Sequence, residues 1–402
     1  MTSEWNHSTI NDVCVLVTDG SHSSPKSVND GKYMVSVKDF TDYGFDFASC
    51  RMISNDDYET LKRNGCVPQI DDILIGKDGA RFFEDIIIYR QREKPALLSS
   101  IAILRCDKSK ILPDFLYYVL RTPSFRQDVK DNYGSGSAIP RIILKDFKRM
   151  MVSYPSLEKQ QAIISVLTAI DSKIQANTEI NDNLEQQAQA IYHERFETVS
   201  PNDLPSEWRI VTLGEVATIS NKRFNLLKEP EILLEHYSIP AFDEARFPVF
   251  ELSTSIKSNK FIIDASCFMI SKLNPTTKRV WKPYCLTGNA VCSTEFIVYK
   301  AKDKTITDFL YSVIDSNSFS DFMCSHVTGS TGSRQRTTPS DTLSYELILP
   351  SEDELAEFQS LVSPMYAQIR INAIENDRLK RLRDSLLPKL MSGEIDVSAV
   401  QF

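Results

Sequence analysis

The stretch Asn132–Phe147, "NYGSGSAIPRIILKDF", is the first place in the chain where a residue pattern could hold a phosphate group. A phosphate-binding loop of this kind ends in a lysine followed by serine or threonine, which open a helix. Here the loop leads to Arg141, and the residues that follow, Ile142–Leu144, form an apolar run typical of a strand. We therefore interpret the stretch as a loop that feeds a strand, with extended backbone before Pro140.

The other residues that could do chemistry do not form a catalytic set. The tetrapeptide Asn274–Thr277, "NPTT", lacks the second proline and the aromatic residue with which an adenine methyltransferase would clamp a flipped base. The five histidines are isolated, and the spacing of Cys285 and Cys292 suits neither a zinc site nor a redox pair. These patterns predict reduced cysteines, no bound metal and no cofactor held by this chain. They favour a protein that recognises a partner and leaves catalysis to others.

Composition allows two domains and gives no sign of a membrane. The chain has 402 residues, of which 42% are hydrophobic and 25% charged, with a net charge of −8. No apolar run approaches the roughly 18 residues of a membrane span, and the start "MTSEWNHSTI" has no secretory pattern. We therefore expect a cytoplasmic protein without a membrane partner. The acidic excess lies in residues 157–200 and 351–402, which leaves two nearly neutral segments that could each present a basic face.

Short motifs recur in the same order in the two halves of the chain. They are "SEW" at Ser3–Trp5 and Ser206–Trp208, "DFLY" at Asp114–Tyr117 and Asp308–Tyr311, and the glycine–serine loops that lead to Arg141 and Arg336. The offset is 203 residues for the first motif, 194 for the second and 195 from Arg141 onward, and this nearly constant spacing indicates a tandem duplication. The middle of each copy shows no convincing sequence match. A shared frame with different inserts suits a protein that recognises two different targets, although drift of surface loops would give the same pattern.

Two long helices are expected between and after these copies. Residues 157–196 contain no glycine or proline, and Ser156 is a suitable N-cap. Apolar residues recur on a heptad in this segment and again 195 residues later, where Asn372 and Asn376 repeat Asn177 and Asn181. Buried asparagines on a coiled-coil seam fix register, so we expect the two helices to pair. Two amphipathic helices that each cover their own domain are the alternative.

Basic, hydroxyl and amide residues gather in several loops and could contact base edges or phosphates. In the first copy the candidates are Ser21, His22, Ser23, Ser24, Lys26, Lys77, Arg81, Ser135, Ser137 and Arg141. In the second copy they are Asn221, Lys222, Arg223, Lys272, Asn274, Lys278, Arg279, Arg334 and Arg336. Ordinary polar loops would supply similar residues.

The chain resembles the specificity subunit of Type I restriction–modification systems over essentially its whole length. The residues that carry the resemblance are "DGSHSSPK", "DDILIGKDG", "GSGSAIPRIILKDF", "SKLNPTTKRVW" and the C-terminal "RLKRLRDSLLPKLMSGEI". It implies an α/β (α+β) fold with two target-recognition domains, separated by two long antiparallel coiled-coil helices in a pseudo-two-fold internal repeat. By this analogy residues 1–156 and 201–350 are the recognition domains. Residues 157–200 and 351–402 are then the spacer and docking helices.

The resemblance also implies a mode of action. Each recognition domain would read one half of a bipartite double-stranded DNA target, and the helices would set the gap. The partners would be two methyltransferase subunits, which carry S-adenosylmethionine, and two restriction subunits, which use ATP and Mg²⁺. Three alternatives remain open: the recognition subunit of a related system with a fused methylase–nuclease partner, a bivalent protein scaffold without DNA binding, and a stand-alone enzyme.

Overall fold

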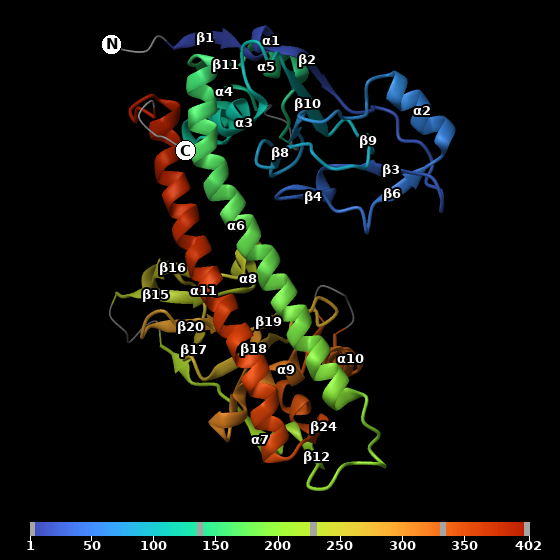
Figure 1. Cartoon of the computed structure of the whole chain (residues 1–402), viewed down its shortest axis with the longest axis vertical. Helices are drawn as coiled ribbons and strands as arrows, with labels where there is room; N and C mark the ends of the chain where they lie inside the picture. The colour runs from blue at the N-terminus through green and yellow to red at the C-terminus, as the bar shows by residue number, and fades with distance from the viewer. Residues whose placement is uncertain (1–4, 135–139, 226–230, 330–334, 398–402) are drawn as a thin grey trace. The chain divides into compact units, whose positions relative to one another are not determined.

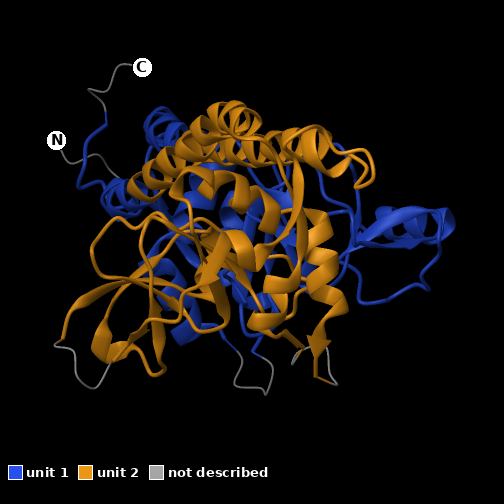
Figure 2. Cartoon of the chain, turned by 90° about the horizontal axis from the view of Figure 1, so that it is seen from below, with its two compact units in different colours: residues 1–172, 379–402 blue, residues 173–378 orange. Residues whose placement is uncertain are grey.

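The computed structural model of the protein describes residues 5–134, 140–225, 231–329 and 335–397, which form two compact units (Figure 2). Unit 1 consists of residues 1–172 and 379–402, and unit 2 of residues 173–378. Each long helix contributes one part to each unit. These units therefore differ from the expected division into two recognition domains and two helices, which stays a prediction. Within the described ranges, no helix combines the length and apolar character needed to cross a membrane.

Unit 1 is built on a four-stranded antiparallel sheet with the order β2-β10-β7-β8. These strands are β2 (Cys14–Asp19), β10 (Ile101–Cys106), β7 (Ile73–Gly76) and β8 (Ile86–Ile88). β7 is buried along its whole length, and β10 along nearly all of it, which agrees with their continuous apolar sequences. Two smaller sheets join β1 (Asn6–Thr9) with β11 (Met151–Tyr154), and β4 (Phe40–Thr41) with β5 (Gly44–Phe45).

The insert of unit 1 consists of the segment between β2 and β7 together with β9, which lies between β8 and β10, and it forms a three-stranded sheet and one helix. The strand order is β6 (Arg51–Ile53), β3 (Lys32–Val35) and β9 (Ala96–Leu97), and β3 runs parallel to β9. Helix α2 (Asn55–Arg63) follows β6, because Ser54 caps its first turn. Its buried Tyr58 and Leu61 are three residues apart and therefore face the same side.

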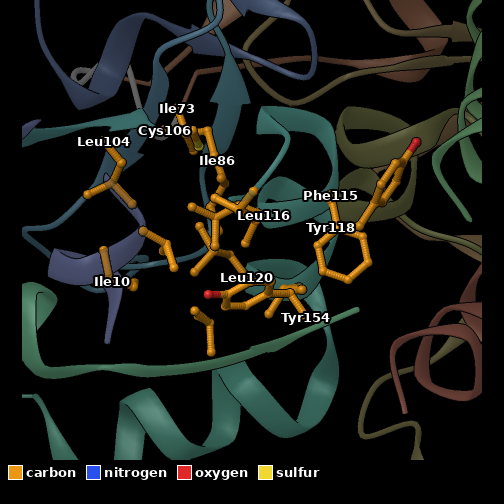
Figure 3. Packing of buried hydrophobic residues seen from close by; sticks show 14 of the residues in the cluster. Ile10, Ile73, Ile86, Leu104, Cys106, Phe115, Leu116, Tyr118, Leu120 and Tyr154 are labelled. Atoms are coloured by element: carbon orange, nitrogen blue, oxygen red, sulfur yellow. The ribbon is translucent and has the colours of Figure 1, made fainter. Parts of the chain in front are cut away.

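Four further helices complete the main core of unit 1. They are α1 (Ile10–Val13), α3 (Pro113–Arg121), α4 (Pro123–Asn132) and α5 (Leu144–Arg149). Helix α3 begins with proline, which favours the first helical position. Its Phe115, Leu116 and Leu120 pack with Ile73 and Leu104 of the sheet (Figure 3). This packing fixes the strand ends from which the candidate site is built.

The chain's C-terminal segment belongs to the same core. Leu387, Leu390 and Val397 are buried in the cluster that also contains Ile163 and Leu167 of α6. Shortly after α11 ends, Gly393 has a positive φ of 76°. A side chain there would come within 2.8 Å of the Trp5 ring. Unit 1 is therefore completed by residues from the far end of the sequence.

Unit 2 repeats the frame of unit 1. Its four-stranded sheet has the order β13 (Ala217–Ile219), β21 (Phe296–Ala301), β18 (Cys267–Ser271) and β19 (Val280–Trp281), and β12 (Arg209–Thr212) pairs with β24 (Glu346–Leu349). The insert sheet has five strands, in the order β14 (Arg223–Phe224), β17 (Lys260–Ile262), β20 (Ala290–Ser293), β15 (Leu233–Tyr237) and β16 (Val249–Leu252). The helices are α7 (Leu213–Val216), α8 (Ile239–Ala245), α9 (Thr307–Ile314) and α10 (Asn317–Ser325).

The two frames correspond in register as well as in order. Gly76 faces Ile101 in unit 1, and Ser271 faces Phe296 in unit 2, so both partners are displaced by 195 residues. Each insert also contains one parallel strand pair, β3 with β9 and β15 with β20. The structure thus confirms the internal repeat and extends it into the middle of the copies, where the sequences alone show no match.

The segment after Arg141 is not a strand, so that prediction is wrong. Arg141 makes only an isolated bridge with Asp78, and helix α5 begins at Leu144. Leu144 and the buried Phe147 are three residues apart and so share one helical face, while Asp146 pairs with Arg149 at 3.0 Å. These local contacts favour a helix over the strand that the apolar run suggested.

Within unit 2, α6 (Leu157–Tyr192) and α11 (Glu352–Met391) lie side by side and antiparallel (Figure 1). Asn177 Nδ2 donates to Asn376 Oδ1 at 2.9 Å, and Asn372 Nδ2 donates to Asn181 Oδ1 at 2.8 Å. Two polar layers therefore lie inside an otherwise apolar seam. A shift of either helix by one heptad would leave these amides facing apolar residues.

Substitution of Asn177 and Asn376 should show that the two side chains stabilise the protein jointly. We expect Asn177→Leu to lower the free energy of unfolding by about 2 kcal/mol, because Asn376 loses a buried partner. The double variant Asn177→Leu/Asn376→Leu should recover most of this loss, since two apolar residues can pack together. Urea unfolding of both single variants and the double variant measures the coupling. Strictly additive losses would contradict the pairing, and Glu179→Ala on the exposed face serves as the control.

Buried Glu235 organises the insert of unit 2. It is fully buried on β15, and its carboxylate accepts hydrogen bonds from the backbone N–H groups of Leu286 and Thr287 at 2.9 and 2.8 Å. The Tyr237 hydroxyl donates to the same carboxylate at 2.5 Å. That hydroxyl in turn accepts from the Tyr284 N–H at 2.8 Å. One carboxylate and one phenol thus hold the loop that precedes β20.

Candidate nucleic-acid interface

In unit 1, the end of β7, the start of β10 and the segment before α5 meet at one place, which we call the first junction (Asp19, Lys77, Asp78, Ser100 and Arg141). The Lys77 N–H donates to Ser100 O at 2.9 Å, and the Ile142 N–H donates to Lys77 O at 3.0 Å. The Gly79 N–H donates to Pro140 O at 3.0 Å. Segments far apart in the sequence are therefore held together by backbone hydrogen bonds.

The side chains of the first junction combine an anchored lysine with an exposed arginine. Lys77 is buried, and its Nζ lies 3.3 Å from Asp19 Oδ2. His22 Nε2 lies 3.3 Å from the other oxygen of the same carboxylate. Arg141 is exposed, and none of the ion pairs found among the described residues includes it. An exposed guanidinium on a fixed backbone is suited to contact a phosphate or a guanine edge.

Unit 2 contains the same arrangement, which we call the second junction (Lys272, Asn274, Glu295 and Arg336). The Lys272 N–H donates to Glu295 O at 2.9 Å, and the Thr337 N–H donates to Lys272 O at 3.1 Å. The Asn274 N–H donates to Gln335 O at 3.0 Å. Gly79 and Asn274 occupy the same place and both have positive φ, 95° and 47°, a conformation that glycine and asparagine adopt most readily.

The side chains at the two junctions differ although the backbone is shared. Arg336 Nε and Nη2 bind the Glu295 carboxylate at 3.0 and 3.3 Å, whereas Ser100 stands at the place of Glu295 in unit 1. The Ser100 hydroxyl and Asn274 Oδ1 are both buried without a hydrogen-bond partner among the described residues. Buried polar atoms of this kind require an explanation, and a bound ligand provides one. The two junctions thus offer different sets of donors and acceptors on one frame.

The loop after β2 has a partly structural role. Ser21 is buried and binds Ser23 through its hydroxyl at 2.9 Å, and Ser24 accepts a hydrogen bond from Arg51. His22 and Lys26 are exposed. Ser21 therefore shapes the loop, and only the other candidates of this segment present their side chains to solvent.

Several predicted contact residues are instead held in ion pairs. Arg81 pairs with Asp85 at 2.9 Å, Lys278 with Asp315 at 2.9 Å, and Arg279 binds Asp243 through two nitrogens. Burial raises the pKa of Asp315, and Lys278 opposes this effect. The Arg279 side chain is 13% exposed, so Arg279 is anchored within unit 2 rather than presented to a partner.

Of the remaining candidates, some are exposed and others lie outside the residues that the structure describes. Asn221, Lys222 and Arg223 follow β13 and are exposed, at the start of the insert of unit 2. Ser135, Ser137 and Arg334 lie outside the described residues. Sequence reasoning missed Ser100 and Glu295, because they become recognisable only when the copies are aligned through the strand register. Among the described residues, no group of three histidine, cysteine or acidic side chains could hold a metal ion, and the eight cysteines are free.

Comparison with known proteins gives a consistent family. Residues 2–186 match the model of the Type I restriction modification DNA specificity domain. The chain is 25% identical to the MjaIX specificity subunit of Methanocaldococcus jannaschii, over 72% of this chain and 71% of that protein. It is 22% identical to the HindI specificity subunit of Haemophilus influenzae, over 73% and 80%.

A solved structure shares the fold. The S subunit of a Type-I restriction-modification system from M. genitalium aligns with a TM-score of 0.56 at 16% identity, over 97% of this chain and 96% of that chain. Two units with a repeated frame, together with the paired helices, therefore give this chain the fold of such an S subunit. The chain is thus similar to Type I restriction–modification specificity subunits, and its residues 2–186 match their DNA specificity domain. The matched domain is a DNA specificity domain, and both relatives are specificity subunits of Type I restriction enzymes.

Proposed function

We propose that each unit reads one half of a bipartite DNA target through its junction and the adjoining insert. The observation that carries this proposal is the pair of junctions, in which the same three backbone hydrogen bonds present different side chains. A common frame explains why both units could approach DNA in the same way. The exchange of Ser100 for Glu295, and of Asp78 for Leu273, explains why they would read different sequences.

The paired helices are proposed to set the gap between the two halves. The support is the pair of asparagine layers, which restricts α6 and α11 to one alignment. By analogy with the family, the helices and the adjoining parts of the units would dock two methyltransferase subunits and, through them, two restriction subunits. S-adenosylmethionine and ATP with Mg²⁺ would then be bound by those partners.

A map of 6-methyladenine across the genome tests the proposal. Cells that carry this chain and its methyltransferase partner are compared with cells that lack only this chain. We expect a two-part motif with a fixed gap that disappears on deletion. Unchanged methylation, with the partner shown to be active, would exclude a role of this chain in directing methylation and would favour the scaffold alternative.

Arg141→Ala should weaken DNA binding strongly. Loss of an exposed guanidinium that contacts DNA costs about 1–3 kcal/mol, or about 5- to 150-fold in affinity. The matched control is Lys108→Ala, since Lys108 is exposed in the same unit but lies beyond the opposite end of β10 and pairs with Asp71. Fluorescence anisotropy with a duplex carrying the mapped target gives both affinities at one salt concentration. Equal affinities of Arg141→Ala and Lys108→Ala would show that Arg141 does not contact DNA.

A further inference from the structure

Three arginines converge on one cavity of unit 1, away from the residues assigned to the first junction. The cavity has a volume of about 230 Å³. Arg121 is the last residue of α3, Arg126 lies on α4, and Arg383 lies on α11. The other lining residues are Tyr118, Pro123, Asp384 and Leu387. The positive charge of this site exceeds that of its single lining carboxylate.

Two of the three guanidinium groups are held by side chains of unit 1. Arg383 Nη1 donates to Asp171 Oδ1 at 2.8 Å, and its Nε donates to Asp384 Oδ1 at 2.9 Å. Arg121 donates to the Tyr117 hydroxyl and stacks on the same ring at 4.8 Å. Because each guanidinium carries five N–H donors, these contacts leave donors for a further acceptor.

Arg126 is the least satisfied of the three. Its Nη2 donates to Glu84 O at 3.1 Å, but its Nε is buried without a hydrogen-bond partner among the described residues. Burial and, after it, the positive charge of Arg121 lower the pKa of Arg126. A buried donor beside a second cation is the environment that an anion would complete.

The internal repeat shows that this charge is not a requirement of the fold. The "DFLY" motif starts α3 at Asp114 and recurs at Asp308 in α9, which places Asp315 where unit 1 has Arg121. The same alignment places Ser320 where unit 1 has Arg126. Unit 2 therefore builds the same helix pair with a carboxylate and a hydroxyl, and the cationic cavity is particular to unit 1.

We infer that the cavity formed by Arg121, Arg126 and Arg383 binds a phosphate group. Guanidinium groups match the oxygen geometry of phosphate with paired hydrogen bonds, and three of them can share one tetrahedral anion. The group could come from free phosphate or from a phosphodiester of the DNA backbone. The site lies outside the first junction, and its existence does not depend on the proposed reading of DNA.

Thermal unfolding of the full chain tests the site with inorganic phosphate as the probe. At equal ionic strength, we expect 10 mM phosphate to raise the Tm by several degrees relative to chloride. Arg126→Gln should lose most of this increase, while Arg63→Gln on the exposed face of α2 should keep it. Circular dichroism of both variants checks that they fold. A wild-type Tm that does not respond to phosphate, or the same response in Arg126→Gln, would overturn the inference.

The salt dependence of duplex binding distinguishes the two sources. If a DNA phosphodiester occupies the cavity, Arg126→Gln should reduce the slope of log K against log salt by about 0.9. An unchanged slope, together with the phosphate-dependent Tm, assigns the site to free phosphate. A third outcome is that the wild type shows no phosphate response and Arg126→Gln impairs only binding to the methyltransferase partner. The cavity would then bind a carboxylate of that partner, and the inference would fail. If the wild type does not bind duplex DNA at all, the proposed function is contradicted, while the phosphate-dependent Tm still supports the site.

Discussion

Removal of one heptad from both paired helices should shorten the gap of the DNA target by about three base pairs. The change deletes Ile174–Ile180 from α6 and Ala373–Leu379 from α11, which retains the layer of Asn181 and Asn372. Seven helical residues correspond to about 10 Å at 1.5 Å per residue, or about three base pairs at 3.4 Å each. A methylation map of cells carrying the shortened chain should therefore show the two half-site sequences unchanged around a shorter gap.

The matched control deletes the heptad from α6 alone. This variant removes Asn177, leaves Asn376 without its partner and makes α6 one heptad shorter than the α11 it pairs with, so we expect loss of methylation rather than a new gap. Altered half-site sequences in the doubly shortened chain would show that the helices, and not the units, carry sequence recognition. An unchanged gap would show that another part of the complex sets the spacing.

Glu235→Ala should lower the free energy of unfolding of unit 2 by about 3 kcal/mol. The substitution removes an acceptor from two backbone N–H groups and from the Tyr237 hydroxyl, all in a buried setting. Each donor left without a partner costs about 1–3 kcal/mol, and partial relaxation of the loop limits the sum. Urea unfolding measures the change. Glu244→Ala, on the exposed end of α8, should stay within about 0.5 kcal/mol of the wild type.

A second measurement separates folding from recognition. Because the loop held by Glu235 precedes β20 in the insert of unit 2, the variant should also weaken recognition of one half-site only. Methylation in cells would then show relaxed sequence preference in that half and normal preference in the other. Equal effects on both halves would mean that the two units do not read their half-sites independently.

The helices and the repeat could be predicted from sequence because their signals are local or repetitive. The heptad pattern and its four asparagines predict paired helices, and the asparagines are hydrogen-bonded across the pair. The run Ile142–Leu144 gave a wrong prediction, since three apolar residues do not distinguish a strand from the entry to a helix. The conformation of this run depends on Phe147, which is buried in a core made by segments distant in the sequence.

The candidate site was only partly predictable for a related reason. Lys77, Arg141, Asn274 and Arg336 stand out as polar residues in loops, but their grouping into two junctions depends on strand register. Arg279 has the same appearance in sequence and is bound to Asp243. Whether an arginine is available or already paired depends on tertiary contacts, which composition and spacing do not determine.

The position of Leu387, Leu390 and Val397 in the core of unit 1 has a consequence for biosynthesis. Residues 1–172 emerge from the ribosome first. The core of their unit nevertheless stays incomplete until the 24 residues 379–402 have been made. Unit 2, a continuous segment of 173–378, is fully available before then. The nascent chain therefore exposes apolar surface at its oldest end throughout the synthesis of unit 2. A ribosome that stops before Leu387 would release a product with an unfinished first unit, a natural substrate for chaperones and proteases.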